Sequence, residues 1–112
     1  MDKEHRRELK RRAAEFKPQM GVVSFSWAPT GEVFFAAARN VPALLNRTRL
    51  QAETGTLPNK RLQELWANYG EEAMAYAVVE ELDYQDGVDD YADDLDLLLE
   101  ECLAAHPGAQ RL

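Results

Sequence analysis

Residues 22–38 read VVSFSWAPTGEVFFAAA, and this stretch decides the fold because it predicts a β-hairpin. From Val23 onward its first part places bulky apolar side chains at every second position, which is the period of a strand with one buried face. Pro29 and Gly31 then stand at positions that a type I turn favours. Residues 33–38 are apolar again and return as a second strand. The hairpin predicts a sheet whose first two strands are antiparallel.

Two helices are predicted to follow the hairpin, because each has a capping residue at its start and a glycine at its end. Asn40 caps the first helix, Pro42 lies in its first turn, and Gly55 stops it. Asn59 caps the second helix, and Gly70 ends it. The apolar stripe of the second helix, which we expect to pack into the core, consists of Leu62, Leu65, Trp66 and Tyr69.

The remaining predicted elements are a helix at each end of the chain and a third strand. Residues 2–16 are rich in the helix formers Glu, Lys, Arg and Ala, and Pro18 ends that helix. Residues 74–79 predict a strand, and after an acidic loop a last helix begins near Val88 and is closed by Pro107. The order is αββααβα. We therefore expect an α+β fold in which helices flank a three-stranded antiparallel sheet.

The composition indicates a single domain over residues 1–112. The length is sufficient for one modest core, and hydrophobic residues make up 46% of the chain. Cys102 is the one cysteine, so no internal disulfide can form and a reducing compartment is expected. No stretch approaches the roughly 20 apolar residues of a membrane span. We predict a cytoplasmic protein without a membrane partner.

Charge is distributed unevenly along this chain, whose net charge is −7. Between residues 80 and 101 there are eleven acids and neither Lys nor Arg, whereas residues 1–17 hold seven bases and four acids. The acidic segment should repel phosphate and suits a basic partner; the simpler interpretation is a solvated surface. The candidate contacts for a basic partner are Asp86, Asp89, Asp90, Asp93 and Asp94.

Bases are few in the middle of the chain, and they cluster around the starts of the two helices predicted there. They could form one patch that contacts nucleic acid. The alternative is a set of dispersed surface charges that nearby glutamates balance. The candidate nucleic-acid contacts are Arg39, Arg47, Arg49, Lys60 and Arg61.

Several short motifs, taken together, resemble a known nuclease family. They are KPQMGV at residues 17–22, NR at 46–47, PNKRLQELW at 58–66, YGEE at 69–72 and VEEL at 79–82. The chain resembles the GIY-YIG nuclease superfamily, and within it the small standalone bacterial members. The basic N-terminal helix at residues 1–17 precedes the resembling core at 18–82, and the acidic loop and last helix at 83–105 match loosely. The resemblance implies a three-stranded antiparallel sheet flanked by helices, and hydrolysis of a phosphodiester with one divalent metal ion.

The positions that this family uses for catalysis are occupied here by residues without that chemistry. Where the two family motifs place tyrosines, this chain has Val23 and Phe34. Where the family has an arginine and, one turn later, a histidine, the chain has Leu44 and Thr48. The position of the metal-binding glutamate falls on Leu99. Because hydrocarbon side chains cannot donate, accept or ionise, we predict a degenerate domain with no catalytic residue, no cofactor and no bound metal.

Three functions remain open on the sequence. The first is a catalytically silent domain with a binding or regulatory role, whose partner is either a protein or a nucleic acid. The second is a Mg²⁺-dependent DNA endonuclease in which Arg47 contacts phosphate and Glu100 or Glu101 replaces the missing metal ligand. The third is an acidic module that binds a basic protein or mimics nucleic acid. Cys102 and His106 are half of a metal site, but no second pair accompanies them, so a buried cysteine is the simpler interpretation.

Overall fold

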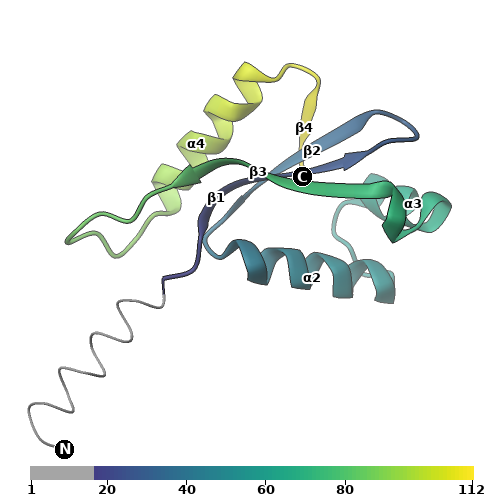
Figure 1. The fold of residues 1–112 in the computed structure, drawn as a ribbon, viewed down its shortest axis with the longest axis horizontal. Helices are drawn as coiled ribbons and strands as arrows, with labels where there is room; N and C mark the ends of the chain where they lie inside the picture. Colours follow the sequence, from purple (N-terminus) through teal and green to yellow (C-terminus); the bar gives the residue numbers. More distant parts are fainter. Residues whose placement is uncertain (1–16) are drawn as a thin grey trace, which may run out of the picture.

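The computed structural model describes residues 17–112, and the helix predicted over residues 2–16 lies outside the described residues. A twisted sheet forms the centre, with helices on both of its faces (Figure 1). The strands are β1 (Met20–Trp27), β2 (Glu32–Ala38), β3 (Met74–Leu82) and β4 (Ala109–Arg111). The helices are α2 (Val41–Thr54), α3 (Lys60–Tyr69), the short 3₁₀ helix η1 (Glu71–Ala73) and α4 (Ala92–Ala105). None of these helices is long and apolar enough to cross a membrane.

The hairpin predicted from residues 22–38 is confirmed. β1 and β2 are antiparallel, and their register pairs Phe25 with Phe34. The N–H of Gly31 donates to the carbonyl oxygen of Trp27 across 2.8 Å and closes the turn. Gly31 has a φ of 75°, a left-handed conformation that glycine adopts at little cost because it has no Cβ. The turn is therefore set by local sequence.

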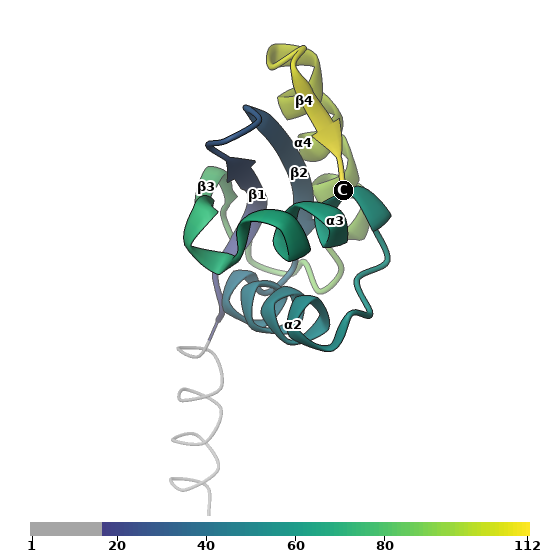
Figure 2. The same cartoon turned by 90° about the vertical axis from the view of Figure 1, so that its right-hand side faces the viewer.

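The prediction of a three-stranded antiparallel sheet is wrong in both strand number and direction, although the α+β class is confirmed. Within residues 17–112 the sheet has four strands in the order β3-β1-β2-β4, and β4 runs parallel to β2. Pro107 and Gly108 follow α4 and redirect the chain, which returns beside β2 (Figure 2). β4 has only 3 residues, too few for a period of two to reveal a strand in the sequence.

Both faces of the sheet are covered, so β1 is buried on two sides. On the face that α2 and α3 cover, Val23, Phe25 and Trp27 are all 0% exposed. On the other face, Val22 is also 0% exposed and packs in a cluster with Leu99 of α4. The prediction of one buried face is therefore wrong at Val22. The alternation of side chains along a strand does not show which faces a distant helix will cover.

The helix starts predicted at two asparagines are confirmed. The Asn40 side chain accepts a hydrogen bond from the N–H of Ala43 at 3.1 Å, and the Asn59 side chain accepts one from Leu62 at 3.0 Å. These bonds satisfy backbone donors that the first turn of a helix leaves without a partner. At the other end of α2, Gly55 adopts the left-handed conformation that is common after a helix.

Helix α4 begins at Ala92, later than the predicted start near Val88. The buried Tyr91 holds the preceding loop, because its hydroxyl accepts a hydrogen bond from the N–H of Gln85 at 2.9 Å. The side chain of Asp90 accepts a further bond from the N–H of Ala92 at 2.9 Å. Because these contacts hold the residues before Ala92 in a loop, the helix does not start at Val88.

The apolar stripe predicted on α3 is buried only in part. Leu62 and Leu65 are 0% exposed, as expected, whereas Tyr69 is 45% exposed. Trp66 is half-buried and meets Trp27 edge to face, with ring centroids 6.5 Å apart. Tyr69 is the last residue of α3, where the helix extends past the core.

Candidate functional site on helix α2

Five positions correspond, by the resemblance, to catalytic residues of the family, and we call them the family positions. The first two lie on neighbouring strands, on the sheet face that α2 and α3 cover. Val23 of β1 is 0% exposed and Phe34 of β2 is 1% exposed. Both belong to one apolar cluster with Leu62 and Leu65 of α3. A tyrosine at either place would need space and a polar partner for its hydroxyl. The side chains that are present fill this face with hydrocarbon instead.

Two further family positions lie on α2, and the structure brings them together with Arg47. Leu44 is half-buried against the same apolar cluster, and Thr48, one helical turn later, is 4% exposed. Arg47 is exposed. These three residues line a pocket of about 300 Å³, which we call the α2 pocket. The rest of its lining consists of Gln51, Leu57, Pro58, Asn59 and Leu112.

The α2 pocket combines an apolar lining with a few polar groups that can contact a polar or anionic ligand. Arg47 supplies a positive charge, and Gln51 and Asn59 carry amide groups. No carboxylate, imidazole or thiol side chain is part of the described lining. Carboxylates are the ligands that a hard divalent cation prefers, and a side chain with a suitable pKa is needed to activate water. The described lining provides neither.

The fifth family position, Leu99, lies on the opposite face of the sheet. Leu99 is 5% exposed and packs with Phe35 in the cluster beneath α4. Its neighbours Glu100 and Glu101 are exposed, and Glu100 forms an ion pair with Arg111 of β4. Neither glutamate is part of the α2 pocket. The structure therefore separates the predicted metal position from the other four.

Cys102 and His106 also lie on this second face, where Cys102 is 3% exposed and donates to Glu80 Oε2 at 3.8 Å. Burial, and after it the negative charge of Glu80, raises the pKa of the Cys102 thiol above its ordinary value. The His106 ring contacts the carbonyl oxygen of Cys102 through Nδ1 at 2.9 Å and packs edge-on against Phe35. In residues 17–112 no group of three or more His, Cys, Asp or Glu side chains could hold a metal ion.

Two of the five candidate bases around α2 are engaged by groups of the same chain. Arg39 donates to the carbonyl oxygen of Asp89 at 3.2 Å. Arg49 Nε lies 3.3 Å from Glu53 Oε1 and 3.4 Å from Glu71 Oε1. These contacts satisfy part of each guanidinium, so both are less available to a partner than the sequence suggested.

A third base, Arg61, is held by two carboxylates. Its Nε donates to Glu32 Oε2 at 3.0 Å and its Nη1 donates to Glu64 Oε2 at 3.1 Å. The hydrogen bonds raise the pKa of Arg61 and lower the pKa of Glu32. Arg47 and Lys60, by contrast, form no ion pair with another residue in 17–112. They are the two candidate bases that the described chain leaves open.

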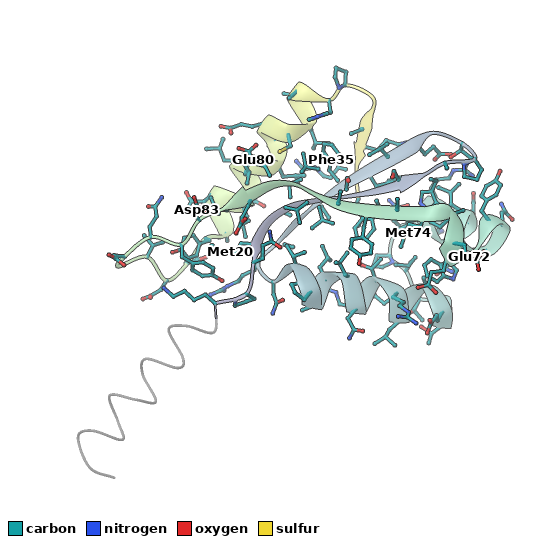
Figure 3. The ribbon with its side chains drawn as sticks, in the orientation of Figure 1. Met20, Phe35, Glu72, Met74, Glu80 and Asp83 are labelled. Atoms are coloured by element: carbon teal, nitrogen blue, oxygen red, sulfur yellow. The ribbon has the colours of Figure 1, made fainter. Side chains whose placement is uncertain are left out.

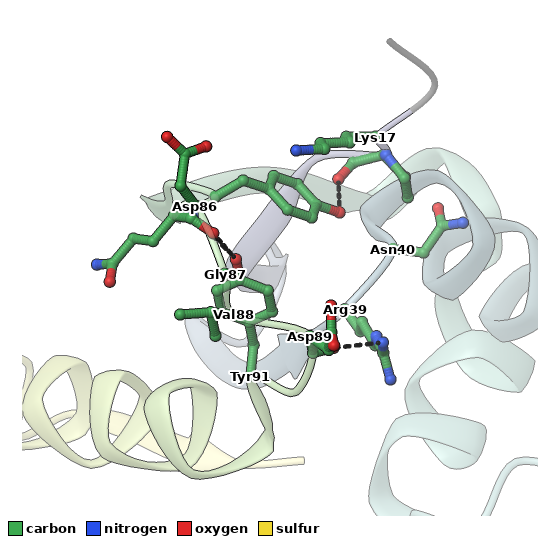
Figure 4. Close-up of a pocket in the computed structure, with 11 residues that line it drawn as sticks. Lys17, Arg39, Asn40, Asp86, Gly87, Val88, Asp89 and Tyr91 are labelled. Carbon is green, nitrogen blue, oxygen red and sulfur yellow. Dashed lines mark hydrogen bonds between the residues drawn. The ribbon is translucent and has the colours of Figure 1, made fainter. Parts of the chain in front are cut away.

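A second and larger pocket, of about 590 Å³, lies beside the acidic loop (Figure 4). Its lining includes the bases Lys17 and Arg39 and the acids Asp86 and Asp89. Two further lining residues are joined to each other, because the Tyr84 hydroxyl donates to the carbonyl oxygen of Pro18 at 2.7 Å. Because both bases and acids line this pocket, it does not present a single sign of charge to a ligand.

The five acids predicted to contact a basic partner are all exposed, but the structure does not gather them into one cluster. Asp86 and Asp89 line the larger pocket, and Asp90 precedes α4. Asp93 and Asp94 lie in the first turn of α4, where the positive end of the helix dipole favours carboxylates.

Gly21 and Leu112 have structural roles that were not predicted from the sequence. A Cβ at Gly21 would stand 2.1 Å from the carbonyl oxygen of Glu80, so only glycine lets β1 and β3 approach this closely. Its place in the KPQMGV motif, two residues before Val23, was the available signal. Leu112 lines the α2 pocket, and its N–H donates to Phe35 at 2.9 Å. No pattern in the sequence pointed to that contact.

Two solved structures of the catalytic domain of the homing endonuclease I-TevI are similar to this chain. The catalytic domain itself aligns with a TM-score of 0.60 and 15% identity, over 83% of this chain and 97% of that one. A point mutant of the domain aligns with a TM-score of 0.60 and 17% identity, over 78% of this chain and 79% of that one. No protein-family model and no curated protein matches the chain. The chain therefore has a GIY-YIG-like fold.

Proposed function

We propose that this chain is a catalytically silent GIY-YIG-like domain with a binding or regulatory role. The observation that carries the proposal is the chemistry of four positions that the resemblance assigns to two tyrosines, an arginine and a histidine. They hold Val23, Phe34, Leu44 and Thr48, and the first three share one apolar cluster. Thr48 is buried beside them on α2.

Each missing group would have made a distinct contribution to phosphodiester hydrolysis. A phenol helps to activate water, and a guanidinium stabilises the charge of the transition state. Removing one such stabilising group typically lowers the rate by about 10²–10³. The absence of several leaves no useful rate, and it does not prevent a binding or regulatory role.

A nuclease that works through Arg47 is the second candidate, and one observation favours it. Arg47 is exposed at the α2 pocket and forms no ion pair with another described residue. The position of the carboxylates opposes it, because Glu100 and Glu101 lie on α4, outside the pocket lining. The described lining does not fit a magnesium ion, since it contains no carboxylate side chain.

The partner of a silent domain is a protein or a nucleic acid, and different surfaces support each. The net charge of −7 and the exposed acids of the loop support a basic protein. Arg47 and Lys60 support contact with a phosphate backbone. We place the domain in the cytoplasm of a bacterium, because its one cysteine suits a reducing compartment and its motifs resemble bacterial members.

A cleavage assay tests the silent site. The purified protein is incubated with supercoiled plasmid and with single-stranded DNA, in magnesium and in manganese, and the products are separated on a gel. We expect no cleavage above that of an Arg47→Ala variant. Metal-dependent cleavage that disappears in Arg47→Ala and persists in the matched Lys60→Ala variant would overturn the proposal.

A pull-down from native lysate, with and without nuclease treatment, separates the two kinds of partner. A protein captured equally in both samples supports direct protein binding. A partner lost on nuclease treatment indicates that nucleic acid is bound, and Arg47→Ala together with Lys60→Ala should then abolish capture.

A further inference from the structure

The outer edge of the sheet at β3 is long and open. β3 is an edge strand of 9 residues, whereas the opposite edge, β4, has 3. Residues 75–78 are all exposed, and no helix of the described chain covers them. A long edge strand offers a row of unpaired backbone groups to any extended chain that reaches it.

The direction of these backbone groups follows from contacts on the inner side of β3. The carbonyl oxygens of Ala73, Ala75 and Ala77 accept hydrogen bonds from the β1 segment. Backbone groups alternate in direction along an antiparallel strand. The N–H and C=O groups of the intervening Tyr76 and Val78 therefore point outward, away from β1.

The first half of this edge is apolar, regular and uncharged. Residues 74–78 read MAYAV, with Tyr76 61% exposed and Val78 38% exposed. The strand carries neither Lys nor Pro, two residues that commonly protect sheet edges. Its one irregularity is Val79, which has no partner on β1 because the register pairs Val23 with Val78 and Val22 with Glu80. A pocket of about 220 Å³ beside Tyr76 leaves room for a partner's side chain.

Acidic residues flank the apolar segment at both ends. Glu72 precedes β3, Glu80 and Glu81 lie near its far end, and Asp83 follows it (Figure 3). All four are exposed, and none forms an ion pair with another residue in 17–112. An occupant of this edge must therefore tolerate or neutralise negative charge at each end.

We propose that β3 binds an extended, basic segment of a partner protein, which adds to the sheet as an antiparallel strand. Main-chain hydrogen bonds to Tyr76 and Val78 supply the pairing, and small or apolar side chains of the partner lie against residues 74–78. Lys or Arg side chains at the ends of the segment meet Glu72 and the carboxylates at 80–83. The proposal rests on the binding role proposed above, but it does not depend on whether the chain cleaves DNA.

A second copy of this chain is a poorer occupant for an electrostatic reason. Pairing two regular segments of residues 74–78 about a twofold axis centres the interface on Tyr76. That register brings the Glu72 end of each segment close to the Glu80 end of the other. Like charges brought together across an interface oppose association. A basic segment converts the same two positions into attractive pairs.

The test uses a fluorescent nine-residue peptide, KTKVTVTVK, titrated into the full chain and followed by anisotropy at low and high salt. Two further peptides carry N-methyl groups on one or the other alternating set of residues. We expect saturable binding that weakens with salt, and a loss of about tenfold or more for only one of the two methylated sets. Equal binding of both methylated peptides would overturn strand addition.

The protein variant Val78→Pro removes an outward N–H and leaves the hydrogen bonds to β1 intact. It should lower peptide affinity by about tenfold or more, while Val78→Thr keeps it. If the proline variant does not fold, Glu80→Gln with Glu81→Gln serves instead, and it should reduce both affinity and salt dependence. Unchanged affinity in the folded variants would contradict the proposal.

A second outcome would also contradict it. Sedimentation could show that the free chain is a dimer and that Val78→Pro dissociates this dimer, which would mean that a second copy occupies the edge. The cleavage assay tests the silent site and the peptide titration tests strand addition at β3. The two measurements are separate, so the failure of one proposal can be distinguished from the failure of the other.

Discussion

Two regions of the molecule, the sheet face beneath α2 and α3 and the outer edge of β3, contain similar residues. The residues are buried in the first region and exposed in the second. On the face, Val23 and Phe34 are at most 1% exposed and belong to the main apolar cluster. At the edge, Val78 is 38% exposed and Tyr76 is 61% exposed. Valine and an aromatic residue occur in both regions, so residue type does not distinguish their roles. The helices that cover one region and leave the other open make the difference.

This difference bears on function because Val23 and Phe34, the two positions that the resemblance assigns to tyrosines, lie on the closed face. Hydrocarbon there adds to the stability of the fold and has no chemistry to offer a phosphate. The open edge adds little to stability, yet it exposes backbone groups that can pair with another chain. Variants in the two regions should therefore separate stability from binding.

The largest expected effect comes from truncating the closed face. Trp27→Ala should lower the free energy of unfolding by about 3–5 kcal/mol, because the side chain is 0% exposed and its removal leaves a cavity. Urea denaturation followed by circular dichroism measures the change. Trp27 Nε1 is buried and has no hydrogen-bond partner in the described chain. Trp27→Phe should therefore cost less, since it removes that unpaired donor.

The matched truncation at the open edge is Tyr76→Ala. We expect the free energy of unfolding to change by no more than about 0.5 kcal/mol, as is usual for exposed positions. A loss as large as that of Trp27→Ala would show that the edge is covered in solution. That outcome would remove the contrast between the two regions.

The next largest effect is expected where the face and the edge meet, at Gly21. Gly21→Ala should destabilise the fold by about 1–3 kcal/mol, because the new Cβ would stand 2.1 Å from the carbonyl oxygen of Glu80 and push β3 away from β1. Thermal unfolding measures this loss. Gly108→Ala is the control, since nothing lies within 4 Å of a Cβ built there. Equal stability of the two variants would mean that β3 can shift freely.

The smallest effect concerns the surface ion pair between Glu32 of β2 and Arg61 of α3, which borders the closed face. The hydrogen bond from Arg61 holds the pKa of Glu32 below its ordinary 4.5. A carboxylate with a lowered pKa in the folded state stabilises the fold above its unfolded pKa, and this contribution is lost as the pH falls through the folded pKa. Both side chains face solvent, so salt should weaken the effect.

Melting temperatures of the parent chain and Glu32→Gln, compared from neutral pH down to pH 3, check this prediction. The parent should be slightly more stable above pH 4.5, and the difference should disappear at the acidic end of the series. A difference that grows toward acid would contradict the sign. High salt should shrink the difference near neutral pH.

Much of the candidate site could be predicted because it depends on residue identity. Val23, Phe34 and Leu44 lack polar groups wherever they lie, so the sequence alone predicts that they cannot supply the chemistry that the resemblance assigns to their positions. The sequence could not show which of the five candidate bases are free to contact a partner. Arg61 is paired with Glu32, 29 residues away in the sequence, and Arg39 is bonded to the backbone of Asp89, 50 residues away.

The sequence by itself determined the hairpin, the two capped helices and the third strand, because turns, caps and alternation depend on interactions between residues that are close along the chain. Only the tertiary structure decided the parallel strand β4, the burial of Val22 beneath α4 and the open edge of β3. Each of these depends on which distant segments meet. Sequence periodicity carries no information on such contacts, because they form only when the chain closes long loops and packs its core.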